Sequence, residues 1–169
     1  MNTELKYALL CGTGLSLWVL AEYALGFHST SLEIGQYSGY FSILVPLILI
    51  YSALRDRQEK NGPQLSWKDG INSGFRIAFY SGVLFTLFMI IYHVYINPEW
   101  IDATVEWQRK KLILGGATDD EIGRFTEMHR NMNSLAAQII TGFVGTTTIG
   151  VLITLIEIPV VRILGRPKT

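Results

Sequence analysis

Four ionisable side chains lie within or at the ends of long apolar stretches: Glu22, Arg76, His93 and Glu157. A charged group in lipid is costly unless it is paired, so these residues are the first candidates for function. Glu22 and His93 should lie near one membrane surface, and Arg76 and Glu157 near the other. We expect Arg76 and Glu157 to form an ion pair or to contact lipid headgroups. Glu22 should gain positive charge or a hydrogen bond from His93 or His28.

No pattern in the chain points to catalysis, a cofactor or a metal. No two of the three histidines have metal-ligand spacing, and Cys11 lies alone in an apolar stretch, where we expect it to pack as a small residue. His129 has no nucleophile or carboxylate constellation around it in the sequence. The 14 basic and 14 acidic residues cancel without a long basic run, which argues against nucleic acid as a partner. We predict that the protein is not an enzyme, although a site assembled from separate spans stays an alternative.

These residues must be positioned by helices that cross a membrane. Roughly 20 apolar residues in a helix span a hydrocarbon core, and backbone groups in lipid must pair within the helix. The sequence therefore predicts an all-α integral membrane bundle of four transmembrane helices in a single domain of residues 1–169. The predicted spans are about 7–27, 35–54, 74–96 and 135–158.

Lysine and arginine in the short loops predict the orientation of the four spans. Basic residues precede the first span, fill the loop of residues 55–73 and follow the fourth span: Lys6, Arg55, Arg57, Lys60, Lys68, Arg162, Arg166 and Lys168. This pattern places both termini in the cytoplasm, although the extracytoplasmic segment 97–134 carries five basic residues as a contrary signal. One alternative is a signal peptide cleaved after Val19-Leu20-Ala21.

Small residues recur every fourth position in the third and fourth spans. The two series are Gly70, Gly74, Ala78, Gly82 and Thr86, and Gly142, Thr146, Gly150 and Thr154. Such ridges let two helix backbones approach closely in lipid. We therefore predict that these two spans pack ridge against ridge. In the second span, Pro46 should clash with the carbonyl of Ser42 and kink the helix.

Segment 97–134 has the caps of two amphipathic helices. Asn97-Pro98-Glu99 is typical of a helix start, Gly115-Gly116 of a helix end, and Thr118 and Glu121 have the spacing of a capping box. The hairpin would present apolar side chains to the membrane surface or to a protein partner, or would simply cover the end of the bundle. The candidate surface residues are Trp100, Trp107, Leu114, Ile122 and Phe125.

Several local sequences make the chain similar to a known family. They are Leu5-Lys6-Tyr7-Ala8-Leu9, Tyr51-Ser52-Ala53-Leu54-Arg55-Asp56, Leu65-Ser66-Trp67-Lys68-Asp69-Gly70, Asn97-Pro98, and Gly116-Ala117-Thr118-Asp119-Asp120-Glu121-Ile122. The chain resembles domain of unknown function 4199, a bacterial family of small four-span membrane proteins. The resemblance implies a multi-pass protein of the bacterial inner membrane and no assigned activity. The tryptophans of the outer helix depart from the usual pattern.

Two functions fit the sequence. The first is a non-enzymatic accessory or scaffold component of a membrane assembly, whose partners are the lipid bilayer and either a second protein or further copies of the chain. The alternative is a small oligomeric transporter or channel-like protein. That alternative is weakened because transporters usually place their binding groups at the bilayer midplane, where this chain has only small or hydroxyl side chains.

Overall fold

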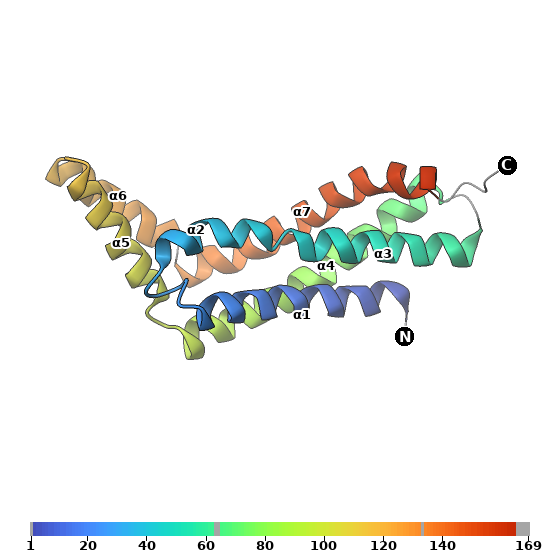
Figure 1. Cartoon of the computed structure of the whole chain (residues 1–169), viewed down its shortest axis with the longest axis horizontal. Helices are drawn as coiled ribbons and strands as arrows, with labels where there is room; N and C mark the ends of the chain where they lie inside the picture. Colours follow the sequence, from blue (N-terminus) through green and yellow to red (C-terminus); the bar gives the residue numbers. More distant parts are fainter. Residues whose placement is uncertain (1, 63–64, 133, 165–169) are drawn as a thin grey trace.

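The computed structural model describes residues 2–62, 65–132 and 134–164, and within them every regular element is helical. The helices are α1 (Thr3–Ala24), α2 (Leu32–Phe41), α3 (Leu44–Asn61), α4 (Trp67–Ile91), the π-helical turn η1 (Tyr92–Ile96), α5 (Trp100–Leu114), α6 (Asp119–Met132) and α7 (Leu135–Leu164). Figure 1 shows α1, α2 with α3, α4 and α7 as a long bundle from which α5 and α6 project at one end. The all-α prediction is confirmed.

Within the described residues, four segments are long and apolar enough to cross a membrane, as predicted: Thr3–Ala24, Leu32–Lys60, Trp67–Ile96 and Leu135–Leu164. Several extend beyond the apolar stretches because backbone hydrogen bonding continues through charged residues. The loop between the second and third spans is correspondingly shorter than residues 55–73. Ser66 caps α4 through its hydroxyl, which accepts the Asp69 backbone N–H at 3.1 Å.

The second span is interrupted at Ser42, whose backbone carbonyl cannot accept a hydrogen bond from Pro46. Helix α2 ends at Phe41, the chain turns at Ser42 and Ile43, and α3 begins at Leu44. Pro46 has no N–H to donate to Ser42, and the Ser42 carbonyl instead accepts the Val45 N–H at 3.0 Å. The predicted kink is therefore a break between two helices. No residue of α2 is buried, so this half of the span packs loosely.

The most extensive helix contact joins α4 and α7, followed by that between α1 and α4. Five of the predicted small residues lie at close approaches in the α4–α7 contact. A Cβ on Gly70 would meet Ile158 at 2.8 Å, and one on Gly150 would meet the Cβ of Ala78 at 2.5 Å. Gly74 lies directly against Thr154. These contacts agree with the predicted ridge packing.

The outer half of the predicted ridge differs from the expectation. A Cβ on Gly142 would meet nothing within 4 Å, so this glycine does not belong to the contact. Gly82 faces Thr147, whose hydroxyl would lie 3.0 Å from an added Cβ, and Thr146 instead lines a cavity. A four-residue repeat drifts slowly around a helix of 3.6 residues per turn, so it cannot hold one face over the whole of α7.

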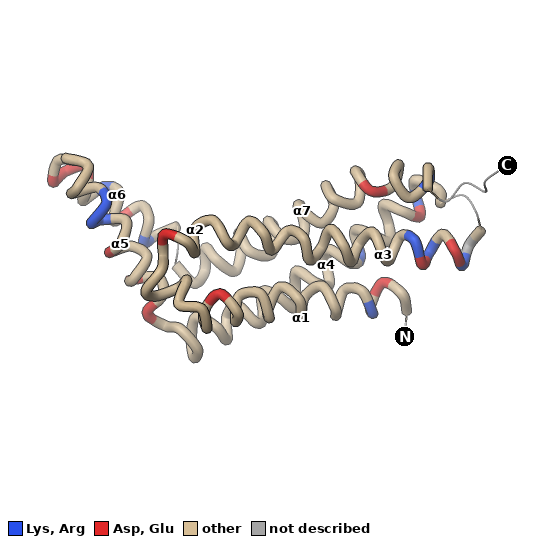
Figure 2. Tube along the Cα trace, viewed as in Figure 1, with Lys and Arg blue, Asp and Glu red and all other residues tan. Residues whose placement is uncertain are grey.

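The start of α1, the end of α3, the start of α4 and the end of α7 lie at one end of the bundle, and the projecting hairpin lies at the other (Figure 1). Figure 2 shows charged residues gathered at both ends and sparse between them. Arg166 and Lys168, which entered the orientation prediction, lie outside the described residues.

Candidate functional site

A hydrogen-bonded cluster around Glu22 lies at the hairpin end of the bundle. The Glu22 side chain is buried, and its Oε1 accepts the indole N–H of Trp18 at 2.9 Å and the hydroxyl of Ser38 at 2.6 Å. Its other oxygen lies 3.4 Å from Nε2 of His28. Of the two partners predicted for Glu22, His28 makes the direct contact. Helices α1 and α2 and the turn between them position the cluster.

His28 connects this carboxylate to the third span. Its Nδ1 lies 2.6 Å from the hydroxyl of Tyr92, which also accepts the side-chain N–H of Asn97 at 3.1 Å. A neutral imidazole that accepts from Tyr92 at Nδ1 and donates from Nε2 towards Glu22 satisfies this geometry. Burial lowers the pKa of His28 below its usual range, although the nearby Glu22 carboxylate acts in the opposite direction. His28 therefore bridges two spans chiefly as a neutral group.

The π-helical turn η1 presents Tyr92 and His93 on this side of the bundle. Such turns insert one extra residue and often occur at functional sites. His93 Nδ1 donates to the backbone carbonyl of Met89 at 2.8 Å, which leaves Nε2 buried without a hydrogen-bond partner in the described part of the chain. The Trp100 ring lies 5.1 Å from the His93 ring and 5.2 Å from the His28 ring between centroids. Trp100 thus covers the cluster.

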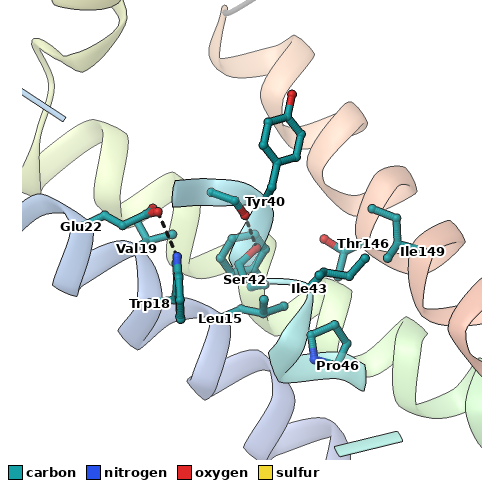
Figure 3. A pocket seen from close by; sticks show the side chains of 12 residues that line it. Leu15, Trp18, Val19, Glu22, Tyr40, Ser42, Ile43, Pro46, Thr146 and Ile149 are labelled. Atoms are coloured by element: carbon teal, nitrogen blue, oxygen red, sulfur yellow. Dashed lines mark hydrogen bonds between the residues drawn. The ribbon is translucent and has the colours of Figure 1, made fainter. Parts of the chain in front are cut away.

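An apolar cavity of about 260 Å³ adjoins this cluster. Figure 3 shows side chains from α1, from the break between α2 and α3, and from α7 around it, with Glu22 at one side. The lining residues are Leu15, Trp18, Val19, Glu22, Gly39, Tyr40, Ser42, Ile43, Pro46, Phe85, Thr146 and Ile149. The interruption of the second span creates this space, because α2 does not pack tightly against the other helices. The cavity is the candidate functional site.

The predicted ion pair of Arg76 with Glu157 does not form. Arg76 is exposed on the face of α4 that also carries Asn72 and Tyr80. Glu157 is buried on α7, and its Oε2 has no hydrogen-bond partner among the residues that the structure describes. Arg76 follows the packed residue Gly74 by two positions. In a helix, two residues correspond to about 200°, so the side chain must point away from the α4–α7 contact.

An ion-pair cluster at the opposite end of the bundle was missed in the sequence. The buried Glu4 carboxylate contacts the Arg57 guanidinium and accepts the Ser73 hydroxyl at 3.2 Å, and Arg57 also lies 3.7 Å from Asp69. Three spans meet through these side chains. The available signal was that Glu4 precedes Ala8 by one turn and therefore shares its buried face. The cluster fixes the ends of the spans relative to one another.

The candidate surface residues of the hairpin divide into three kinds. Trp100 faces the bundle and the Glu22 cluster, as described above. Trp107 is half-buried, with the Lys111 ammonium 4.1 Å from its ring centroid. Ile122 and Phe125 are half-buried on α6, where the Phe125 ring stacks on that of His129, while Leu114 is 88% exposed at the tip. Only part of the predicted surface is therefore open to a partner.

Explicit caps define the hairpin. Helix α5 ends in a turn with Gly116 at φ +77°, a conformation that favours glycine, and the Ala117 N–H donates to the Leu112 carbonyl at 3.1 Å. The Thr118 N–H donates to the Glu121 carboxylate at 2.8 Å, as the capping box predicts. These Thr118 hydrogen bonds lower the pKa of Glu121. The start of α5 is two residues later than the Pro98 pattern indicated, with Glu99 at the N-cap.

Among the described residues, no group of three or more His, Cys, Asp or Glu side chains could hold a metal ion. The four apolar helices define the class of the chain as a membrane protein. A family model described as protein of unknown function (DUF4199) matches residues 6–157, so the chain belongs to this family, as the resemblance indicated. No curated protein and no solved structure matches the chain.

Proposed function

We propose that this protein is a non-enzymatic accessory or scaffold component of a bacterial cell-membrane assembly. The observation that carries the proposal is the α5–α6 hairpin, which projects from the bundle (Figure 1). Helices α5 and α6 contact each other more than α6 contacts α7. A segment that is capped at its turn and projects beyond the spans is suited to binding a second protein.

The surface of the hairpin supports docking. Leu114 is 88% exposed, Met132 64% and Met128 54%. Exposed apolar side chains on a small projecting element are typical of interaction sites, and methionine adapts well to a partner surface. The guanidinium of Arg130 on α6 lies 3.2 Å from the Asp102 carboxylate on α5, an exposed pair that links the two helices. We infer that the partner of the hairpin is another membrane or surface protein, and not nucleic acid.

We propose that the chain ends face the cytoplasm and that the hairpin lies outside. The short connection of α1 to α2 has no lysine or arginine, whereas the start of α1, the end of α3 and the start of α4 carry Lys6, Arg57, Lys60 and Lys68. A membrane-impermeant thiol reagent can test this orientation on intact cells with a Leu114→Cys variant. The proposed orientation predicts labelling, because it places residue 114 outside and the native Cys11 is buried.

The alternative is a small oligomeric transporter or channel-like protein. The observation in its favour is that the hydroxyls of Thr86 and Thr147 are buried without hydrogen-bond partners among the described residues. Unpartnered hydroxyls within apolar spans could serve a polar solute in an assembly of several copies. The accessory proposal accounts for the projecting hairpin, which the transporter alternative leaves without a role, and we therefore favour the accessory proposal.

Native mass spectrometry of the protein, extracted gently from its own membrane, tests the accessory proposal. A second polypeptide at fixed stoichiometry is expected, and it should be lost from a Leu114→Glu variant. The matched control is Thr118→Ser, which retains the cap at the same end of the hairpin. A charged residue on a membrane span, such as Ile156→Glu, is unsuitable as a control because the Ile156 side chain faces lipid. A homo-oligomer without a second polypeptide would contradict the accessory proposal and favour the transporter alternative.

A further inference from the structure

The cavity beside Glu22 is a groove that extends along helix α1. Leu15 and Glu22 both line it and are seven residues apart on α1, which corresponds to about 10 Å along the helix axis. Apart from Glu22, its lining is mainly apolar, with Pro46 and Ile149 among the walls (Figure 3). An elongated apolar space with a single carboxylate at one end matches an amphiphile with one polar end.

The carboxylate at the end of the groove has no cationic partner of its own. The groups that contact Glu22 are an indole N–H, a hydroxyl and the imidazole of His28. Among the described residues, the ion pairs of lysine and arginine with acidic residues lie elsewhere, at the opposite end of the bundle or on the hairpin. A buried carboxylate without a permanent counter-ion is complementary to a cationic ligand.

We propose that this groove binds one acyl chain of a membrane lipid whose primary ammonium headgroup lies at Glu22. The ammonium supplies both the missing positive charge and N–H donors for the carboxylate. The Glu22 end is at the end of the spans, where lipid headgroups lie, and the groove continues from there towards the middle of the bundle, where acyl chains lie. Trp18 at the boundary is suited to this interfacial depth.

The surroundings of the groove favour a lipid as its occupant. Helix α2 forms one wall, has no buried residue, and exposes Tyr37, Tyr40 and Phe41 at 62%, 76% and 60%. In a bilayer these aromatic side chains meet lipid directly. A lipid can therefore enter sideways between α2 and the neighbouring spans, without passing through water.

The test is native mass spectrometry of the full chain in detergent, titrated with equal amounts of phosphatidylethanolamine and phosphatidylglycerol. We expect the first lipid bound to be phosphatidylethanolamine, with at least a tenfold preference. Glu22→Gln should reduce that preference to near one. Glu33→Gln is the matched control, because it removes an exposed carboxylate from the same end of the bundle and should leave the preference unchanged.

A second variant and a second lipid keep the test decisive if Glu22→Gln does not fold. Gly39 lines the groove, and a Cβ there meets nothing within 4 Å, so Gly39→Phe should fold, fill the space and abolish binding of the first lipid. On the unaltered protein, phosphatidylcholine, which has no ammonium N–H, should bind at least several-fold more weakly than phosphatidylethanolamine. Equal binding of all three lipids by the unaltered protein would overturn the proposal, as would a preference that survives Gly39→Phe.

Discussion

Two glycines of α7 belong to one four-residue series in the sequence, yet the structure gives them opposite surroundings. A Cβ on Gly150 would lie 2.5 Å from the Cβ of Ala78, whereas a Cβ on Gly142 would meet nothing within 4 Å. Non-bonded carbons prefer separations of about 3.5–4.0 Å, so Gly150→Ala requires α4 and α7 to separate by about 1 Å. Overpacking of this kind costs about 1–3 kcal/mol.

The comparison of Gly150→Ala with Gly142→Ala isolates this packing cost. Both substitutions gain about 1 kcal/mol of helix propensity, which cancels between the variants. We expect Gly150→Ala to have a free energy of unfolding about 1–3 kcal/mol lower than that of Gly142→Ala, equivalent to roughly a 5- to 150-fold change in the folded-to-unfolded ratio. The assay is reversible unfolding by sodium dodecyl sulfate in mixed micelles, followed by circular dichroism. Equal stability of the two variants would refute the α4–α7 contact.

Three further outcomes follow from the structure. Arg57→Met leaves a buried carboxylate unpaired and should lower the free energy of unfolding by about 3 kcal/mol, whereas Arg55→Met removes only an exposed pair and should change it by less than about 1 kcal/mol in the same assay. Pro46→Ala restores a backbone N–H that can donate to Ser42, so the new amide should be protected from hydrogen exchange; rapid exchange there would show that something other than the proline interrupts the span. Because folding lowers the pKa of His28, the unfolded chain binds the proton more tightly than the folded one between that lowered pKa and the ordinary value of 6.5, so stability should fall as the pH falls through this window. Thermal melts from pH 7.5 to 5 should show a weaker dependence of stability on pH for His28→Gln than for the unaltered protein. The same dependence in both proteins would contradict the burial of the imidazole.

Patterns that depend on a few neighbouring residues were sufficient to predict the local features. The capping box of Thr118 and Glu121 forms as expected, because its hydrogen bonds join residues three apart. Pro46 acts on the carbonyl four residues before it, so the place of the break followed from covalent geometry. The four apolar helices follow from the need of every backbone group in lipid for a partner within its own helix.

Side-chain partners between spans could not be predicted in the same way. Arg76 and Glu157 have opposite charges and similar predicted depths in the membrane, but they meet only if both helices are rotated to face each other. The depth of a residue does not determine the rotation of its helix. Glu4 was overlooked because it lies near the chain terminus, whereas its burial depends on where the third and second spans place Ser73 and Arg57. Similarly, the four-residue spacing of small residues in α7 did not determine which of them would contact α4.

The sequence by itself therefore determined the class of the protein, the number of its spans, its capped hairpin and the place where the second span is disturbed, because each depends on the polarity or covalent geometry of contiguous residues. Only the tertiary structure decided that His28 joins Glu22 to Tyr92 and that an apolar groove ends at this carboxylate. These features depend on the relative rotation and separation of α1, α2 and α4, which are set by the packing of all the spans at once.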